Sequence, residues 1–189
     1  MLKDIIGASE EIKLYTERLI LRFMKPQDAA DMFEYAQRED VTKNLLWSPH
    51  ESVDFTRAYL KQLQKVYRRG DYYDFAVTLK DSGKLIGTCG IVTWDKENRA
   101  CEIGYVINPD YRGKGYAPEA ANAVCDFAQD RLDVHRIYAK HMAENEASHR
   151  VMEKIGMKYE GTHKDMLFVK GKYRTVVICA KIVGDEKAI

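Results

Sequence analysis

A junction between a strand and a helix in the middle of the chain constrains the fold more than any other segment. Residues 105–117 read Tyr-Val-Ile-Asn-Pro-Asp-Tyr-Arg-Gly-Lys-Gly-Tyr-Ala. A strand runs into a loop with glycines at alternate positions, 113 and 115, and a helix pattern begins at once. Such a loop directs successive backbone N–H groups into one concavity, and the helix N-terminus adds about half a positive charge. The segment therefore predicts an anion-binding site built mainly from backbone.

Two common phosphate-binding motifs do not fit this loop. The P-loop ends in Gly-Lys-Ser/Thr, whereas Tyr116 follows Gly115 here. The dinucleotide fingerprint requires a third glycine at the place that Pro118 occupies. The anion that binds here is therefore not held by either standard nucleotide motif.

The rest of the chain alternates between strand and helix patterns. Period-2 or continuous apolar runs predict strands over residues 19–23, 72–79, 85–94, 100–107, 134–142, 158–169 and 173–182. Helical spacing predicts helices from Pro26 to Ala36, up to Gly70, and over 115–132 and 145–155. Short turns join the three strands between residues 72 and 107 into an antiparallel meander. The pattern predicts one α/β (α+β) domain over residues 1–189, with a mixed sheet and helices packed against it.

The apolar positions of three helices indicate which faces are buried. The first helix offers Ala29, Met32, Phe33 and Ala36. The second offers Phe55, Tyr59, Leu63 and Val66, and the third offers Ala121, Val124, Cys125, Ala128 and Leu132. We expect each set to face the sheet.

Composition excludes several other classes of protein. The 189 residues carry 30 basic and 29 acidic side chains, a net charge of +1, so nothing indicates a nucleic-acid partner. No apolar run approaches the roughly 20 residues that span a bilayer, and the N-terminus lacks a signal-peptide core, so we expect a cytoplasmic protein without membrane contact.

Cysteine and histidine spacing argues against disulfides and metals. Cys89, Cys101, Cys125 and Cys179 lie far apart and form no Cys-x-x-Cys pair, so we expect reduced, mostly buried thiols. The histidines at 50, 135, 141, 149 and 163 have no i, i+4 ligand spacing. The sequence therefore predicts no metal site.

The glycine loop also matches the pattern Arg/Gln-x-x-Gly-x-Gly/Ala, with Arg112, Gly115 and Ala117 at the defining places. This resembles the pyrophosphate loop of the GNAT family of N-acetyltransferases. Further segments resemble its RimJ/RimL-like, ribosomal-protein acetyltransferase branch: Arg18-Leu-Ile-Leu-Arg22, Glu102-Ile-Gly-Tyr105, Gly115-Tyr-Ala-Pro-Glu-Ala120, Asn145-Glu-Ala-Ser148 and Glu153-Lys-Ile-Gly-Met157. The ordered set covers roughly residues 17–182, which we take as the domain core.

The resemblance implies a single GNAT-like domain with a mostly antiparallel central sheet flanked by about four helices. It implies acetyl-coenzyme A as donor and an amine as acceptor, on a monomer or homodimer. The residues that it assigns to cofactor binding are Tyr105, Val106, Ile107, Arg112, Gly113, Lys114, Gly115, Tyr116, Ala117, Asn145 and Ser148. Asn145 is also a candidate helix N-cap.

The catalytic groups are harder to assign. Glu102 is the candidate general base, directly or through ordered water, and a solvated strand residue is the alternative reading. Backbone N–H groups of Tyr105 to Ile107 can hold the thioester carbonyl if this strand splays from its neighbour, unless a bulge shifts their direction. Many relatives carry a proton-donating Tyr where this chain has Met152, and the resemblance offers Ser148 instead.

The acceptor amine remains open between two kinds. The RimJ/RimL-like pattern implies a protein N-terminal α-amine, whose pKa near 7.7–8.0 makes it easier to deprotonate than lysine at about 10.4. A small amine such as a polyamine or an aminoglycoside is the alternative, as is a non-catalytic acyl-coenzyme A-binding module. Residues 42–49, the second helix and residues 168–173 are expected to select the acceptor.

Overall fold

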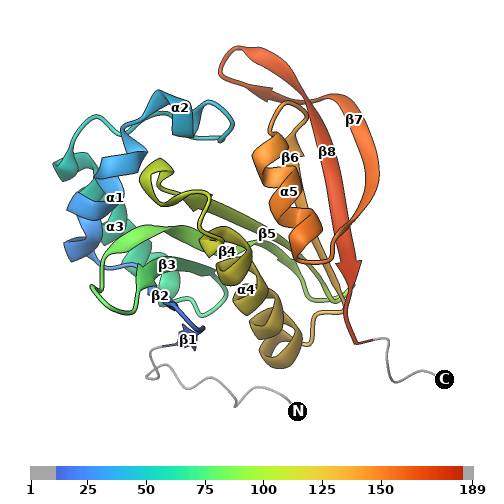
Figure 1. The fold of residues 1–189 in the computed structure, drawn as a ribbon, viewed down its shortest axis with the longest axis horizontal. Coiled ribbons are helices and arrows are strands. Elements are labelled where there is room, and N and C mark those ends of the chain that lie inside the picture. The colour runs from blue at the N-terminus through green and yellow to red at the C-terminus, as the bar shows by residue number, and fades with distance from the viewer. Residues whose placement is uncertain (1–11, 185–189) are drawn as a thin grey trace.

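The computed structural model describes residues 12–184. They form one eight-stranded sheet of order β1-β2-β3-β4-β5-β6-β8-β7 (Figure 1). The strands are β1 Lys13–Tyr15, β2 Leu19–Phe23, β3 Tyr73–Leu79, β4 Leu85–Asp95, β5 Ala100–Ile107, β6 Arg136–Met142, β7 Lys158–Val169 and β8 Lys172–Ile182. Neighbouring strands run antiparallel except β5 and β6, which are parallel because α4 crosses between them. The predicted α/β class with a mixed, mostly antiparallel sheet is confirmed.

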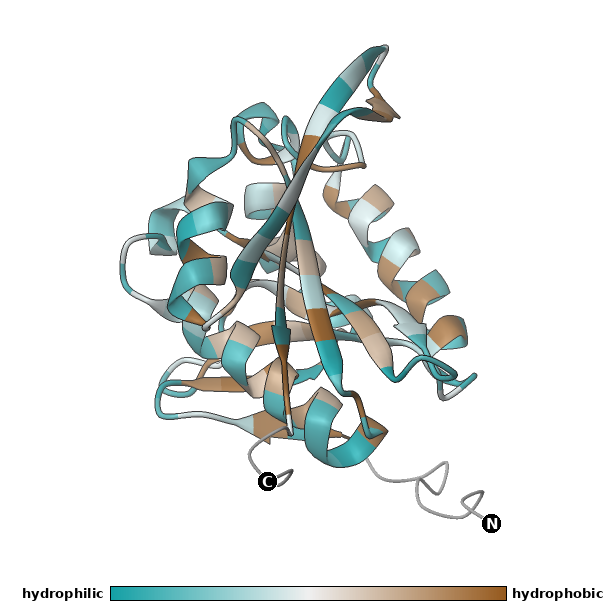
Figure 2. Cartoon of the chain, turned by 90° about the vertical axis from the view of Figure 1, so that its right-hand side faces the viewer, coloured by the Kyte–Doolittle hydropathy of each residue, from teal (hydrophilic) through white to brown (hydrophobic). Residues whose placement is uncertain are grey.

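Helices cover both faces of this sheet, and the long β7–β8 hairpin projects beyond it (Figure 2). The helices are α1 Ala29–Ala36, α2 Glu39–Thr42, α3 Val53–Tyr67, α4 Tyr116–Leu132 and α5 Glu146–Lys154. Single 3-10 turns, η1 Pro26–Asp28 and η2 Pro109–Tyr111, precede α1 and α4. The α1 and α3 helices pack on one face, and α4 and α5 pack on the other.

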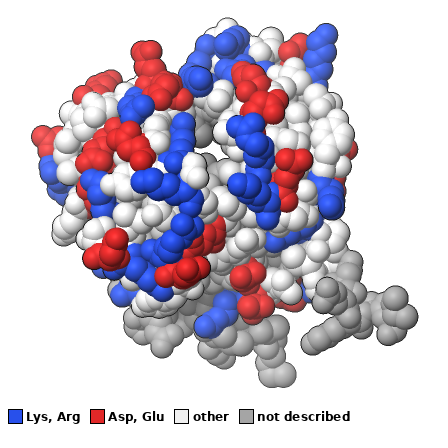
Figure 3. All heavy atoms as spheres, in the orientation of Figure 1, with Lys and Arg blue, Asp and Glu red and all other residues white. Residues whose placement is uncertain are grey.

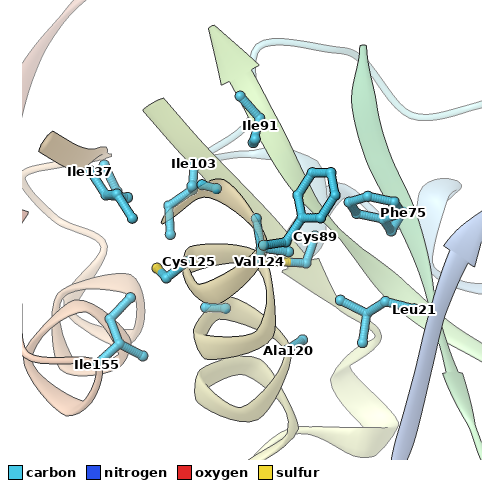
Figure 4. Close-up of a cluster of buried hydrophobic side chains, with 14 of the residues drawn as sticks. Leu21, Phe75, Cys89, Ile91, Ile103, Ala120, Val124, Cys125, Ile137 and Ile155 are labelled. Carbon is cyan, nitrogen blue, oxygen red and sulfur yellow. The ribbon is translucent and has the colours of Figure 1, made fainter. Parts of the chain in front are cut away.

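The larger core lies between the sheet and the α4–α5 layer. Side chains from α4, such as Val124 and Cys125, meet Ile103 of β5 and Phe75 of β3 (Figure 4). The predicted buried stripe of α4 is confirmed at every position: Ala121, Val124, Cys125, Ala128 and Leu132. The four cysteines are free, buried thiols, as expected.

Strands β5 and β6 pair only at their first residues. Ala100, Cys101 and Glu102 pair with Arg136, Ile137 and Tyr138, and beyond this point the strands separate. The rest of β6 pairs with β8 on its other side, up to Met142. Backbone groups of residues 103–107 that face β6 therefore have no ladder partner there, and the sheet opens between the two strands.

The buried face of α3 differs from the prediction. Thr56, Leu60 and Leu63 are buried, whereas Phe55 and Tyr59 are exposed by 50% and 38%. Thr56 occupies the inner face because its hydroxyl donates to the Ser52 carbonyl at 3.1 Å and lies 2.8 Å from His50 Nδ1. A polar residue with both bonds satisfied is tolerated inside, so the prediction was wrong for Phe55 and Tyr59. Leu63 is buried as predicted, and Val66 packs against the same core.

Two short elements were not predicted. The β1 strand has three residues and pairs with β2, which is therefore not the edge strand of the sheet. The α2 helix has four residues and lacks the length that makes a helical pattern visible in a sequence. Within residues 12–184, no helix is long and apolar enough to cross a membrane.

Candidate active site

A cleft of about 610 Å³ lies where β5 and β6 separate. Its walls are the end of β5, the first turn of α4, one side of α5 along its length, and the segment 40–45 around α2. The predicted site residues that line it are Tyr105, Val106, Ile107, Arg112, Gly113, Gly115, Tyr116, Ala117, Asn145 and Ser148. Glu102 and Lys114 do not line it. The structure thus brings together two segments of the motif that are about 30 residues apart in the chain.

The glycine loop has the conformation that an anion cradle requires. Gly113 and Gly115 have φ of +78° and +84°, a region that side chains rarely adopt. Gly115 is the N-cap of the 17-residue α4, and Tyr116 and Ala117, whose backbone N–H groups begin the helix, line the cleft. The Arg112 side chain closes the loop, since its Nε donates to the Ile107 carbonyl at 3.0 Å.

Arg18, the residue just before β2, contacts this loop and does not line the cleft. Its Nη1 donates to the Lys114 carbonyl at 2.9 Å, and its guanidinium lies 4.6 Å from the centre of the Tyr116 ring. Glu119 holds Arg18 in place, because its carboxylate accepts bonds from the Arg18 backbone and Nε at 2.9 and 2.7 Å. Burial opposes ionisation of Glu119, but the bonds from Thr16 and Arg18 outweigh it and lower its pKa. This positioning role of Arg18 could not be predicted from the Arg18-Leu-Ile-Leu-Arg22 motif, because it depends on β2 lying next to the start of α4.

The first turn of α5 presents polar groups to the opposite wall of the cleft. The Asn145 carbonyl oxygen Oδ1 accepts from the Ser148 backbone N–H at 3.3 Å, so the predicted N-cap is confirmed. Asn145 Nδ2 donates to the Ser148 hydroxyl at 3.0 Å, which leaves the hydroxyl proton available for another acceptor. The Tyr105 hydroxyl reaches across from β5 and donates to the Ser148 carbonyl at 2.9 Å. Burial raises the pKa of Tyr105, so this phenol stays protonated.

Glu102 lies at the point where β5 and β6 are still paired. Its carboxylate forms an ion pair of 2.8 Å with Lys140 of β6, and the Glu102 side chain is 13% exposed. Glu102, Gly104 and Val106 share the face of the sheet that carries α1 and α3, because Cys101, Ile103 and Ile107 belong to the core on the other face. The register shift in this region falls in β4, between Ile91 and Thr93. The alternation along β5 is therefore not shifted by a bulge.

Met152 does not face the cleft. It is 1% exposed and belongs to the core between α5 and the sheet. This position of α5 offers no proton donor, so a donor has to come from elsewhere in the cleft.

The tip of the β7–β8 hairpin meets the segment after α2 above the cleft. Lys170 Nζ donates to the Thr42 carbonyl at 2.6 Å, and Arg174 donates to the Lys43 carbonyl at 3.4 Å. Arg174 also forms an ion pair with Glu144, just before α5. Large apolar side chains are exposed on these two segments: Leu46, Phe168 and Tyr173. Two of the three segments expected to select the acceptor therefore lie side by side.

Basic side chains surround the hollow on this face of the molecule (Figure 3). Those that line the cleft are Lys43, Arg112, Arg150 and Lys154, against the acidic Asp40, Glu144 and Glu146. A backbone anion cradle with cationic neighbours suits a ligand that carries phosphate groups.

The strand divergence beside a glycine loop that opens a helix agrees with the resemblance to the GNAT acetyltransferases. The family described as "Acetyltransferase (GNAT) domain" matches residues 18–158, and the chain belongs to this family. It is therefore an N-acetyltransferase whose donor is acetyl-coenzyme A.

Individual relatives agree with this family over most of the chain. An uncharacterised N-acetyltransferase, p20 of Bacillus licheniformis, is 33% identical over 84% of this chain and 89% of its own length. The [ribosomal protein uS5]-alanine N-acetyltransferase of Escherichia coli is 28% identical over 93% of each chain. The crystal structure of a GNAT-family acetyltransferase from Bacillus anthracis has a TM-score of 0.81 at 30% identity, covering 90% of this chain and 98% of that one.

Proposed function

We propose that this protein acetylates the N-terminal α-amine of a protein or peptide in the cleft between β5 and β6. The observation that carries the proposal is the continuity of the cleft, which joins the glycine loop to the segment around α2 beneath the hairpin tip. The 28% identity to the uS5-alanine N-acetyltransferase over 93% of each chain supports a protein N-terminus as acceptor.

The residues in the cleft fit acetyl-coenzyme A. The backbone of Arg112 to Ala117 and the α4 N-terminus suit the pyrophosphate, and the polar first turn of α5 at Asn145 and Ser148 suits the pantetheine arm. When bound, this cofactor supplies the activated acetyl group.

The protein's own groups then have three tasks. The first is to hold the thioester carbonyl, for which the unpaired backbone N–H groups on the open side of Tyr105 to Ile107 are suited. The second is to accept the amine proton. Glu102 is four residues before Val106, about 13 Å along the strand at about 3.3 Å per residue, so we propose that it acts through ordered water.

The third task is to supply a proton to the leaving sulfur. Ser148 is the candidate, because its hydroxyl accepts from Asn145 and so turns its own proton away from that bond. Tyr105 is a weaker candidate, because its proton is engaged with the Ser148 carbonyl and its pKa is raised by burial.

The rim of the cleft favours a peptide over a polycation. Leu46, Phe168 and Tyr173 expose apolar surface that can pack against the first side chains of a peptide. Glu144, an acidic residue of the rim, is already paired with Arg174. An α-amine also requires less basic assistance than a lysine does, because its pKa is lower by more than two units.

The test compares acceptors in a thiol-release assay with acetyl-coenzyme A. Short peptides with a free N-terminus and no lysine should react at least tenfold faster than N-blocked peptides with one lysine, a preference of about 1.4 kcal/mol. Spermidine and an aminoglycoside serve as small-amine comparators. A tenfold preference for the lysine peptide or for either small amine would show that the acceptor proposal is wrong.

A further inference from the structure

Three metal-ligating side chains meet between α5 and the sheet, outside the cleft lining. They are His141 of β6, His149 of α5 and Cys179 of β8. Their ligand atoms lie within 4.8 Å of one another. Among residues 12–184, these three side chains are the group arranged closely enough to hold a metal ion. The three residues are 8 and 30 positions apart in the sequence, so they lack the i, i+4 spacing by which two metal ligands on one helix are recognised.

The separations suit a tetrahedral cation. His141 Nε2 lies 3.1 Å from His149 Nδ1, which lies 3.9 Å from Cys179 Sγ. Zinc binds nitrogen at about 2.0–2.1 Å and sulfur at about 2.3 Å, which places tetrahedral ligand atoms about 3.4–3.6 Å apart. Side-chain shifts of less than about 1 Å would therefore complete three bonds, with the fourth position left to water.

Both imidazoles have an outer partner of the kind that orients metal ligands. His141 Nδ1 lies 2.8 Å from the Met142 carbonyl, to which it can only donate, so the lone pair of Nε2 points into the cluster. His149 Nε2 lies 3.8 Å from the Glu153 carboxylate on the outer side of α5. When Nδ1 of His149 binds a cation, its proton moves to Nε2 and faces that carboxylate.

The protonation state of the cluster is compatible with metal binding. Burial lowers the pKa of His141 and so favours the neutral imidazole that a metal requires. Burial also raises the pKa of Cys179, whose side chain is 1% exposed, so the thiol is neither ionised nor accessible as a nucleophile. A metal converts such a thiol into a thiolate ligand and displaces its proton.

We propose that His141, His149 and Cys179 form a structural binding site for zinc or a similar divalent transition metal. Binding forms two metal–nitrogen bonds and one metal–sulfur bond, releases the thiol proton to solvent and changes no oxidation state. The site would fix α5 to β6 and β8 directly behind Ser148, which lines the cleft. The metal thus stabilises the cleft wall and takes no part in acetyl transfer.

The test uses tag-free, chelator-stripped protein titrated with zinc in a calorimeter and with cobalt in an absorption spectrometer. We expect one equivalent of either metal to bind, with the charge-transfer absorption of a cobalt–thiolate bond, and zinc to raise the melting temperature. His149→Gln should weaken zinc binding at least tenfold, and Cys179→Ala should abolish the charge-transfer band. His163→Gln, a histidine outside the cluster, is the matched control and should bind as the wild type does.

His149 is half-buried, so His149→Gln should fold. If Cys179→Ala fails to fold, the zinc affinity of His149→Gln tests the site. No binding by the wild type, or equal binding by His149→Gln and His163→Gln, would overturn the proposal.

Discussion

Gly113 and Gly115 determine the shape of the anion cradle at the scale of single residues. Both have positive φ, and a Cβ added to Gly115 would lie 3.3 Å from Arg18 Nη2. A non-glycine residue in this region costs roughly 1–2 kcal/mol, and more for a β-branched side chain. The loop therefore depends on glycine for its backbone geometry as much as for space.

Gly115→Val should weaken acetyl-coenzyme A binding about tenfold or more, because the loop must leave its anion-binding conformation to relieve the strain. Gly83→Val is the matched control, since Gly83 also has positive φ, at +70°, in the β3–β4 turn away from the cleft. Calorimetry would measure affinity and circular dichroism would check folding. Equal affinities for the two folded variants would show that the cofactor does not rest on this loop.

Asp74 on β3 provides a second residue-scale prediction. Its carboxyl interacts electrostatically with Tyr59 and Tyr67 of α3, and burial raises its pKa to about 7. The folded protein therefore keeps this proton up to about pH 7, whereas the unfolded chain loses it near 3.9. Between these values the folded state binds more protons, so this group lowers stability as the pH rises.

Asp74→Asn should remove that dependence. Urea unfolding at pH 5 and pH 7.5 should show a larger fall in stability for the wild type than for the variant. The same pH difference in both proteins would show that Asp74 is ionised in the folded state.

Residues that act through local sequence could be predicted, and those that act through pairing could not. The loop from Arg112 to Ala117 is contiguous in the chain, so the sequence alone could predict an anion-binding loop there. The ion pair of Glu102 with Lys140 depends on which strand lies next to β5. The proximity of His141 to Cys179 likewise depends on β6 pairing with β8.

At the scale of elements, the start of β2 supports the start of α4. Arg18 connects them through the Lys114 carbonyl, the Tyr116 ring and the Glu119 carboxylate. These contacts hold the glycine loop before a ligand arrives, which reduces the ordering cost of binding.

Arg18→Met keeps the aliphatic stem and removes the polar contacts. It should weaken acetyl-coenzyme A binding about tenfold, a loss of about 1.4 kcal/mol, with a smaller effect on the rate at saturation. Arg57→Met is the control, because Arg57 is 43% exposed like Arg18 at 42% and pairs with Asp54 on α3. If both variants bind acetyl-coenzyme A like the wild type, the contacts of Arg18 with the glycine loop contribute nothing to cofactor binding.

The observed ends of a strand agree with the predicted ends where the strand pattern in the sequence is long. The predicted strands 100–107 and 158–169 match β5 and β7 at both ends. In the first half of α3 the predicted face was wrong, because Thr56 and its hydrogen bonds occupy the inner side in place of Phe55. The apolar pattern of a helix depends on that helix alone, whereas its buried face also depends on the residues that pack against it.

At the scale of the whole molecule, the cleft combines parts from almost the entire chain. The family match ends at residue 158, but the sheet continues through β7 and β8 to Ile182. These last strands supply the hairpin that closes over residues 42–44. The sequence pattern placed both segments near the acceptor, but only the fold brings them into contact.

The proposed roles converge on Glu102 at the closed end of the β5–β6 opening. Glu102→Gln keeps the shape of the side chain and removes the basic carboxylate. Glu160→Gln is the matched control, because Glu160 is also an ion-paired carboxylate, bound to Arg136 and outside the cleft lining.

The most direct test is the pH profile of the steady-state rate of coenzyme A release, measured with a free-N-terminus peptide for the wild type and these two variants. Glu102→Gln should lose roughly 10²–10⁴-fold in rate with little change in acetyl-coenzyme A affinity, while Glu160→Gln keeps the wild-type rate. A Glu102→Gln rate near that of the wild type, with an unchanged pH profile, would contradict the account and return Glu102 to the role of a strand residue.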